Sequence, residues 1–197
     1  MMHMKSAQKV LTFATSSDWK YRQAQAYVQP QDISLQQARI DLPESRDEDV
    51  VTIAKEKADY AYNKLRRPLI VIDGAFHIKA LNDFPKTFVK FAEKYIGASG
   101  ILKLMEGMAE RSYEWPNVLY YRDADQEKYF VGYIRGTIIN TLPNNSQAND
   151  FGLIQRPDGY VKTFSEMTSK ELHHFETNIW SPTLFEEFTT WYKQTAQ

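Results

Sequence analysis

The sequence of 197 residues contains no cysteine, which excludes disulfide bonds and thiolate metal sites. It also has no apolar run near the roughly 20 residues that a helix needs to cross a bilayer. Neither charge sign is in excess, because 24 Lys and Arg face 25 Asp and Glu. Such a balance is not typical of nucleic-acid-binding or membrane-surface proteins. The first residues lack the apolar core of a signal peptide, so we expect a cytoplasmic protein without nucleic-acid or membrane partners.

The chain is long enough to bury a substantial core and is rich in aromatic side chains. We expect a single domain over residues 1–197, since no internal repeat or linker interrupts the sequence. Most of the 12 Tyr, 11 Phe and 4 Trp should pack in the core or in an interface, because each buries a large area.

The clearest strand signal is the run Pro68-Leu69-Ile70-Val71-Ile72-Asp73-Gly74. An unbroken aliphatic run suits a strand that is covered on both faces, as in the middle of an α/β sheet. Asp73 then lies at the carboxyl end of the strand, where open α/β sheets bind ligands. The run alone fits equally well a buried strand whose aspartate only caps the next turn.

A second candidate site follows the first predicted strand, residues 10–14. A helix is expected over residues 20–28, and Ser17 or Asp18 in the polar stretch before it could cap that helix. Such a turn offers free backbone N–H groups and the positive end of a helix dipole to a phosphate, and Lys20 would add a charge. Taken alone, the pattern favours an ordinary cap with a solvated lysine.

Two further charged residues border the next predicted helix. Residues 33–42 are expected to form a strand and a loop, and Pro43 should place Glu44 on a rigid turn just before the helix. Apolar residues at steps of three and four predict that helix over residues 50–65. Lys57 lies near its apolar face, so it could reach out to solvent, the commoner outcome, or point into a site.

The rest of the chain alternates between extended and helical patterns, with a polar loop at residues 143–150. We expect these elements, in chain order: an extended segment 76–81, helices 88–96 and 101–108 with Ser99 capping the second, a hairpin of 115–121 and 128–134 with Pro116 at an edge or bulge, a strand 151–154, a turn 157–159, and helices 166–175 and 182–193 with Ser181 capping the last.

Several short motifs follow one another in the order and spacing of a known family. They are Phe13-Ala14-Thr15 with Lys20, Asp41-Leu42-Pro43-Glu44, Ala54 with Lys57-Ala58, Val71-Ile72-Asp73, Phe84-Pro85, Arg111-Ser112, Phe151-Gly152, and Pro157-Asp158-Gly159-Tyr160 with Thr163-Phe164-Ser165-Glu166-Met167. In these residues the chain resembles the inosine triphosphate pyrophosphatases, the non-standard purine nucleoside triphosphate pyrophosphatases. The resemblance covers about residues 9 to 168.

The resemblance implies a two-lobed α/β fold, with an elongated mixed sheet flanked by helices and a nucleotide cleft between the lobes. It also implies a homodimer that hydrolyses unusual nucleoside triphosphates to monophosphate and pyrophosphate with Mg²⁺. The implied ligands of the substrate are Thr15, Ser17, Lys20, Lys57 and Phe151, with Phe151 as a stacking ring. The implied catalytic groups are Asp73, Glu44 and Lys20, and the two carboxylates would hold the metal. Cations that offset phosphate charge and carboxylates that fix a hard metal suit this chemistry.

The chain departs from the family pattern at the turn after the first strand and at the central strand. The family usually has Thr-Gly-Asn where this chain has Thr15-Ser16-Ser17, followed by Asp18 and Trp19. At the central strand, the family has two acidic residues and then Ser or Thr, whereas this chain has Ile72-Asp73-Gly74.

The base pocket differs as well. Phe-Gly-aromatic-Asp-Pro becomes 151–155, Phe-Gly-Leu-Ile-Gln, without the carboxylate. The family's Lys-Asn and Ser-His-Arg align with Leu172-His173 and with 176–178, Glu-Thr-Asn. Loss of polar partners changes base discrimination, so we expect a pyrophosphatase with altered base specificity. The alternative is a catalytically weak or inert relative that binds a nucleotide or a partner. His173 and His174 could replace lost contacts, although neighbouring histidines near a helix end are more often surface residues.

Overall fold

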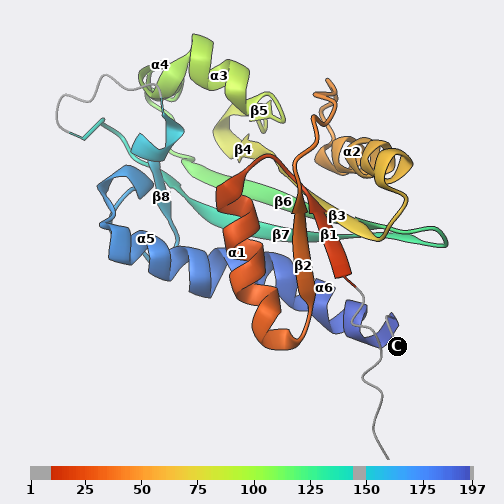
Figure 1. Ribbon diagram of the computed structural model, residues 1–197. Helices are drawn as coiled ribbons and strands as arrows, with labels where there is room; N and C mark the ends of the chain where they lie inside the picture. The colour runs from red at the N-terminus through yellow and green to blue at the C-terminus, as the bar shows by residue number, and fades with distance from the viewer. Residues whose placement is uncertain (1–9, 144–149, 196–197) are drawn as a thin grey trace, which may run out of the picture.

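A long hairpin forms the middle of an eight-stranded mixed sheet in the computed structural model, which describes residues 10–143 and 150–195 (Figure 1). The order is β2-β1-β3-β6-β4-β5, and β7 joins β6 to β8 on the other side. The strands are β1 (Val10–Ala14), β2 (Ser34–Ala38), β3 (Leu69–Gly74), β4 (Phe76–Ile78), β5 (Pro85–Lys86), β6 (Ser112–Arg122), β7 (Glu127–Ile138) and β8 (Gln155–Pro157). β1 is parallel to β2 and β3, and the other pairs are antiparallel.

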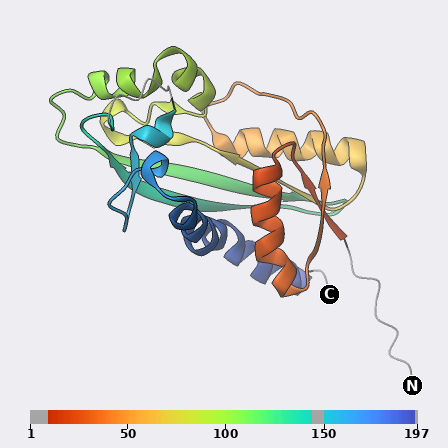
Figure 2. The same ribbon diagram turned by 60° about the vertical axis from the view of Figure 1, so that its left-hand side comes forward.

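Helices cover both faces of this sheet (Figures 1 and 2). They are α1 (Asp18–Val28), α2 (Val50–Leu65), α3 (Val89–Tyr95), α4 (Gly97–Leu104), α5 (Ser169–Phe175) and α6 (Ser181–Thr195), with short 3-10 segments at Gln29–Gln31, Lys79–Leu81, Phe151–Leu153 and Phe164–Glu166. α1 and α6 pack on one face, α2 packs on the opposite face, and α3 and α4 lie at the end formed by β4 and β5 (Figure 2).

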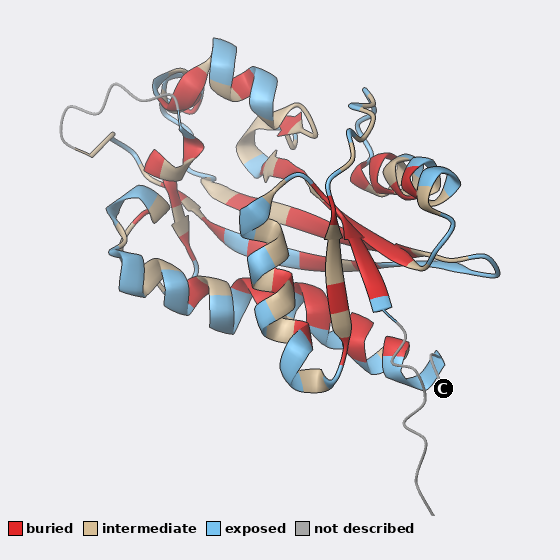
Figure 3. Cartoon of the chain, in the orientation of Figure 1, coloured by how far each residue is buried: buried red, intermediate tan, exposed pale blue. Residues whose placement is uncertain are grey.

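The core follows from the alternation of side chains along the strands. Ile70 and Ile72 of β3 face α1 and α6, whereas Leu69 and Val71 face α2. All four are buried, so β3 is covered on both faces, as its unbroken apolar sequence predicts (Figure 3). A third apolar cluster, which includes Phe76, holds α3 and α4 against the far end of the sheet. The α/β fold with a mixed sheet flanked by helices is therefore the one expected from the sequence.

Pro116 does not lie at an edge or a bulge. β6 is an interior strand, and Pro116 pairs in regular register with Tyr133 of β7. On its other side, its carbonyl accepts a hydrogen bond from Ala75 (3.0 Å), in the break between β3 and β4. Because the partner strand is interrupted there, the missing N–H of proline costs the ladder little.

Some boundaries differ from the expected ones. The predicted strand 151–154 is a 3-10 turn, because the Asp150 carboxylate caps it by accepting the Gly152 N–H (2.6 Å), and the strand starts at Gln155. The extended segment after β3 ends at Ile78, and α5 starts only at Ser169. The turn at residues 157–159 is confirmed, with Gly159 at a φ of +80°.

Neither of the two later serine caps forms. Ser99 lies inside α4, which starts at Gly97. Ser181 has helical backbone angles, because a π-helical segment, Glu176–Trp180, joins α5 to α6 without a break. Most of the polar loop, residues 144–149, lies outside the described part of the chain. Among the described residues, no helix is long and apolar enough to cross a membrane.

Candidate functional site

A cavity of about 1190 Å³ opens between α1, the carboxyl end of β3, α3 and the α5 region. β6 forms its floor. Part of its lining is charged, here called the charged end, and the lining also includes aromatic and amide side chains. Residues lining the charged end include Thr15, Ser17, Lys20, Arg39, Glu44, Arg46, Lys57, Asp73 and Lys90. Five predicted site residues from three segments of the chain, and Glu44 from a fourth, therefore line one space.

The turn between β1 and α1 has the geometry that its sequence predicts. The Ser17 hydroxyl accepts the N–H of Lys20 (3.2 Å), so Ser17 is the N-cap of α1. The Thr15 hydroxyl in turn accepts the N–H of Ser17 (3.1 Å). These bonds fix the turn at the positive end of a helix dipole, on the cavity wall, which suits an anion.

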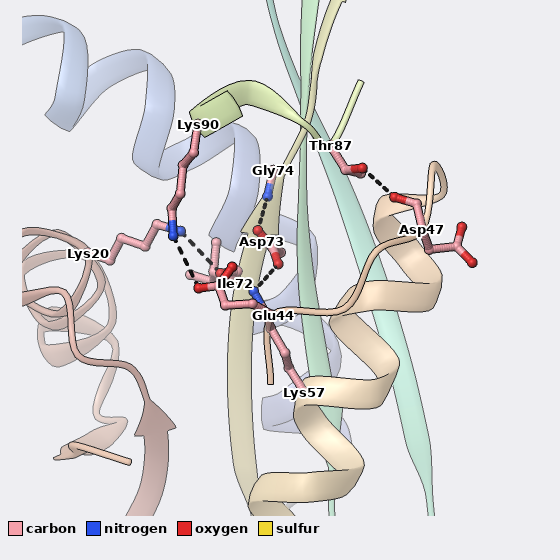
Figure 4. A network of polar contacts seen from close by, with 9 residues as sticks. All are labelled: Lys20, Glu44, Asp47, Lys57, Ile72, Asp73, Gly74, Thr87 and Lys90. Carbon is pink, nitrogen blue, oxygen red and sulfur yellow. Dashed lines mark hydrogen bonds and ion pairs between the residues drawn. The ribbon is translucent and has the colours of Figure 1, made fainter. Parts of the chain in front are cut away.

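Lys57 points into the site rather than out to solvent. Its Nζ lies 2.5 Å from Asp73 Oδ2, and the side chains are 14% and 21% exposed (Figure 4). The other oxygen of Asp73 accepts the N–H of Gly74 (2.9 Å). α2 packs against β3 through its apolar face, and this packing brings Lys57 to the strand's carboxyl end.

Lys20 reaches the same strand end from α1. Its Nζ donates to the carbonyl of Ile72 (3.2 Å) (Figure 4). Burial lowers the pKa of Lys20 from its ordinary value, Asp73 opposes this change, and the nearby charges of Lys57 and Lys90 add to it. Since Lys20, Lys57 and Lys90 here outnumber the carboxylates of Asp73 and Glu44, this end of the cavity favours an anion.

Glu44 lies on the cavity wall but not directly before the helix. α2 begins only at Val50, where Asp49 caps it by accepting the N–H groups of Val51 and Thr52. Glu44 is exposed and forms an ion pair with Lys90 of α3 (3.1 Å). The sequence patterns singled out neither Lys90 nor Asp49. Asp49 had a local signal, because Asp is a preferred N-cap residue and the apolar stripe of the helix begins at Val50.

The described residues contain no group of three or more His, Cys, Asp or Glu side chains arranged to hold a metal ion. Within residues 10–143 and 150–195, therefore, such side chains form no ready-made cage for a metal ion. Mg²⁺ is commonly held by one or two carboxylates together with substrate phosphates, and it keeps several waters. Asp73 and Glu44, both oxygen donors on the cavity wall, fit that mode of binding.

The cavity is also lined by Trp115, Asn117 and Gln155, the first two of which lie close to Gly74. Gln155 is buried, and its side chain makes no hydrogen bond to another described residue. Phe151 is 1% exposed and packs its ring against Phe76, with centroids 5.6 Å apart. It lies behind the wall and offers no open face, so the structure does not favour the predicted stacking role of Phe151.

Contacts between α1 and the π-helical segment close one side of the cavity. Glu176 accepts hydrogen bonds from Trp19 Nε1 and Gln23 Nε2, both 2.7 Å long. The Trp19 ring also packs on Trp180, with centroids 4.8 Å apart. No local sequence signal indicates this cluster, because Trp19 and Glu176 are 157 residues apart.

The two adjacent histidines are surface residues. His173 and His174 are both exposed, and neither is among the residues that line the cavity in the described part of the chain. His174 Nδ1 instead lies 3.1 Å from the Tyr160 hydroxyl. They do not replace base contacts in this structure.

Comparisons with known proteins agree with this fold and with the sequence resemblance. The model of the Ham1 family matches residues 11–177. The chain is 31% identical to a dITP/XTP pyrophosphatase of Saccharolobus solfataricus, over 91% of the chain and 93% of the relative. It is 32% identical to a dITP/XTP pyrophosphatase of Methanopyrus kandleri, over 94% of the chain and 96% of the relative.

Solved structures show the same fold at lower sequence identity. A Ham1 protein from Coxiella burnetii superposes with a TM-score of 0.76 at 16% identity, over 95% of this chain and all (100%) of that one. The Staphylococcus aureus Ham1 protein gives a TM-score of 0.74 at 16% identity, over 94% and 99% of the two chains. The expected fold is therefore confirmed.

Proposed function

The chain belongs to the Ham1 family, and from this membership we propose that it hydrolyses non-standard nucleoside or deoxynucleoside triphosphates to the monophosphate and pyrophosphate. The names of the relatives, dITP/XTP pyrophosphatase, support this activity. The observation that carries the proposal is the Lys57 and Asp73 pair beside Lys20, in a cavity that also contains a helix N-terminus.

The charged end of the cavity would hold the triphosphate. The Thr15 to Ser17 turn presents the start of α1, and Lys20 and Lys57 supply positive charge around Asp73. Charge builds up on phosphate oxygens when the bond between the α- and β-phosphates breaks. Fixed cations in a partly water-excluded site stabilise this charge without reorganising, which is the main electrostatic advantage of an enzyme.

Magnesium is proposed as the cofactor. Asp73 and Glu44 would hold it, together with phosphate oxygens and water. When bound, Mg²⁺ polarises the phosphate being attacked and offsets its charge. The pairing of Asp73 with Lys57 fixes the direction of the carboxylate. Asp73 is therefore positioned to orient either the metal or the attacking water.

Altered base specificity is proposed from the rest of the cavity lining. Its polar groups include the amides of Asn117 and Gln155, and Glu176 lies on the side wall. Phe151 is left out of the base site because its ring is buried. Since hydrogen-bonding sites discriminate strongly through polar partners, this set should give a different order of bases than the family motifs would.

The test is pyrophosphate release from standard, deaminated, methylated and pyrimidine triphosphates, with and without Mg²⁺. Asp73→Asn should abolish turnover. Asp125→Asn, the same change in the exposed turn of the β6–β7 hairpin, is the matched control and should leave turnover unchanged. Absence of pyrophosphate release from every triphosphate would refute the proposed activity.

A catalytically inert nucleotide-binding protein is the second candidate. Both oxygens of Asp73 are already engaged, by Lys57 and by the Gly74 N–H, and Ile72 provides no second carboxylate. Calorimetric binding of a triphosphate without turnover would favour this candidate. Turnover that disappears in Asp73→Asn would exclude it.

A homodimer is proposed from the family resemblance. Exposed aromatic side chains are available for an interface, among them Phe91 and Tyr95 on α3 and Tyr129 and Tyr133 on β7. Light scattering should give twice the mass of the 23.0 kDa chain. A mass near that of one chain would refute the proposal.

A further inference from the structure

Gly74, directly after Asp73, leaves a space that the indole of Trp115 fills. A Cβ atom at Gly74 would lie 2.8 Å from Trp115 Nε1 and 3.3 Å from Asn117 Oδ1. A real Cβ atom essentially never lies within 3.0 Å of another heavy atom in this way, so any side chain at position 74 would displace the indole. The glycine therefore lets the Trp115 N–H approach the end of β3, beside the proposed catalytic carboxylate.

The orientation of Trp115 is fixed by its surroundings. It lies on β6 in regular register with Ile134 of β7. Its ring packs on Phe76, with centroids 4.9 Å apart and planes inclined by 33°. Its carbonyl also accepts the side-chain N–H of Asn117 (3.1 Å). A ring held in this way presents its N–H in one direction before any ligand binds.

The N–H of this indole has no partner among the described residues. Trp115 is half-buried and lines the cavity, yet its Nε1 makes no hydrogen bond within residues 10–143 and 150–195. The indole of Trp19, which also lines the cavity, donates to Glu176 (2.7 Å). Because Trp115 lines the cavity and its N–H is not used by the described residues, this donor is available to an acceptor atom of a ligand bound there.

We propose that Trp115 Nε1–H donates a hydrogen bond to a phosphate oxygen of the bound triphosphate, and that Gly74 is required for this contact. The inference rests on the proposed function for the identity of the ligand. An indole N–H only donates, so it can bind an anion or a carbonyl but not a metal ion. Its position beside Gly74, next to Asp73, and the neighbouring lysines favour the phosphate.

A direct test observes the indole N–H itself. The ¹⁵N-labelled protein should give a separate indole signal for each of its 4 Trp, and Trp115→Phe assigns the one in question. Addition of inorganic tripolyphosphate with Mg²⁺ should move the Trp115 signal downfield. The signal of Trp191, which packs on Phe130 away from the cavity, should stay in place. An unmoved Trp115 signal overturns the inference.

The same experiment keeps the two proposals apart. Turnover of a triphosphate without a shift of the Trp115 signal refutes this contact and leaves the proposed activity standing. A shift without turnover keeps the contact and counts against the activity. If neither is seen, both proposals are wrong.

Replacement of Gly74 and Trp115, singly and together, provides the second test. Trp115→Phe keeps a ring on Phe76 but removes the donor, and Gly74→Ser should push the indole away. Each change should raise the KM for the triphosphate about 10-fold, the effect of one hydrogen bond to a charged group, with a smaller change in kcat.

The double variant Gly74→Ser with Trp115→Phe makes room for the serine hydroxyl where the indole N–H was. It should recover a KM within about 3-fold of the original value, because a hydroxyl can donate the same bond. The inference would be overturned if Trp115→Phe left the KM unchanged. It would also be overturned if the KM increase of the double variant equalled the product of the increases of the two single variants. Trp191→Phe is the control for loss of a tryptophan.

Discussion

At the scale of single residues, Lys57 and Asp73 show how partial burial determines what a charge contributes. The pair is neither exposed nor fully buried, with side chains 14% and 21% exposed. Exposed ion pairs contribute little, and removal of one partner from a buried pair is strongly destabilising. The sequence could place Lys57 near an apolar face, but only the packing of α2 on β3 decides that it meets Asp73.

Replacement of Lys57 by Met should therefore lower the free energy of unfolding by about 2 kcal/mol, between the values for exposed and buried pairs. The cost arises because the Asp73 carboxylate loses its cation in a half-buried place. Urea unfolding measures it. Lys55→Met, on the same helix, removes more exposed ion pairs to Asp59 and Glu127 and should cost less than about 1 kcal/mol. Equal losses in the two variants would contradict the argument.

Lys20 should make substrate affinity sensitive to alkaline pH. Burial holds its pKa below the ordinary value of 10.5. As the pH rises through this lowered pKa, Lys20 loses its charge and the KM for the triphosphate should rise. Lys20→Arg stays charged, so its KM should remain flat over the same pH range. Steady-state kinetics of the two proteins between about pH 7 and 10 makes the comparison, below the ordinary lysine pKa.

The free energy of unfolding should rise with pH over the range in which substrate affinity falls. This difference separates loss of affinity from unfolding. With a lower pKa in the folded state, the unfolded chain binds more protons between the two pKa values, so the free energy of unfolding rises with pH there. A parallel fall of affinity and stability over that range would show that alkaline unfolding, not Lys20, controls the KM.

At the scale of helices and strands, local sequence predicts the elements better than their ends. Strand 10–14 and helix 50–65 have the predicted bounds, and Ser17 caps α1 as expected. The apolar run 151–154 is typical of a strand, yet the Asp150 cap turns it into a 3-10 segment. Ser181 is a good cap by sequence, but the π-helical segment before it leaves no helix start to cap. In both cases a neighbouring contact overrides the local preference.

Asp49 caps α2 and so helps to hold Lys57 in place. Replacement of Asp49 by Ala should cost about 1 kcal/mol of unfolding free energy at pH 7, since the first N–H groups of the helix lose their acceptor. Urea unfolding or thermal melting measures this cost. Glu56→Ala, an exposed change on the same helix, should stay within about 0.5 kcal/mol.

The Asp49 effect should also depend on pH. The hydrogen bond from the Thr52 hydroxyl, with those from the N–H groups of Val51 and Thr52, lowers the pKa of Asp49. The stabilisation is present above the ordinary pKa of aspartate, and it is lost as the pH falls through the lowered value. The difference between the original protein and Asp49→Ala should therefore shrink on acidification. A constant difference would show that charge is not involved.

At the scale of the whole molecule, the serial order of the motifs predicts the fold. The fold then brings together, in one cavity, Thr15, Ser17, Lys20, Lys57 and Asp73. Contacts between distant segments could not be predicted in this way. Lys90 meets Glu44 across 46 residues, and Glu176 meets Trp19 across 157. Such contacts depend on how helices approach one another over the sheet, and local composition carries no signal for that distance.

Because the cavity is lined by segments from both ends of the chain, a ligand in it should stabilise the molecule as a whole. Tripolyphosphate with Mg²⁺ at about 100 times its Kd should add about 2.7 kcal/mol, if only the folded chain binds it. For a protein of this size, each kcal/mol raises the Tm by about 2–4 °C, so the Tm should rise by about 5–11 °C. The net charge of −1 gives no general attraction for anions, so this rise must come from local charges. The variant with Lys20→Met and Lys57→Met should therefore lose most of the rise, whereas Lys55→Met should keep it. A rise that sodium sulfate of equal ionic strength reproduces would show a general salt effect instead of binding in the cavity.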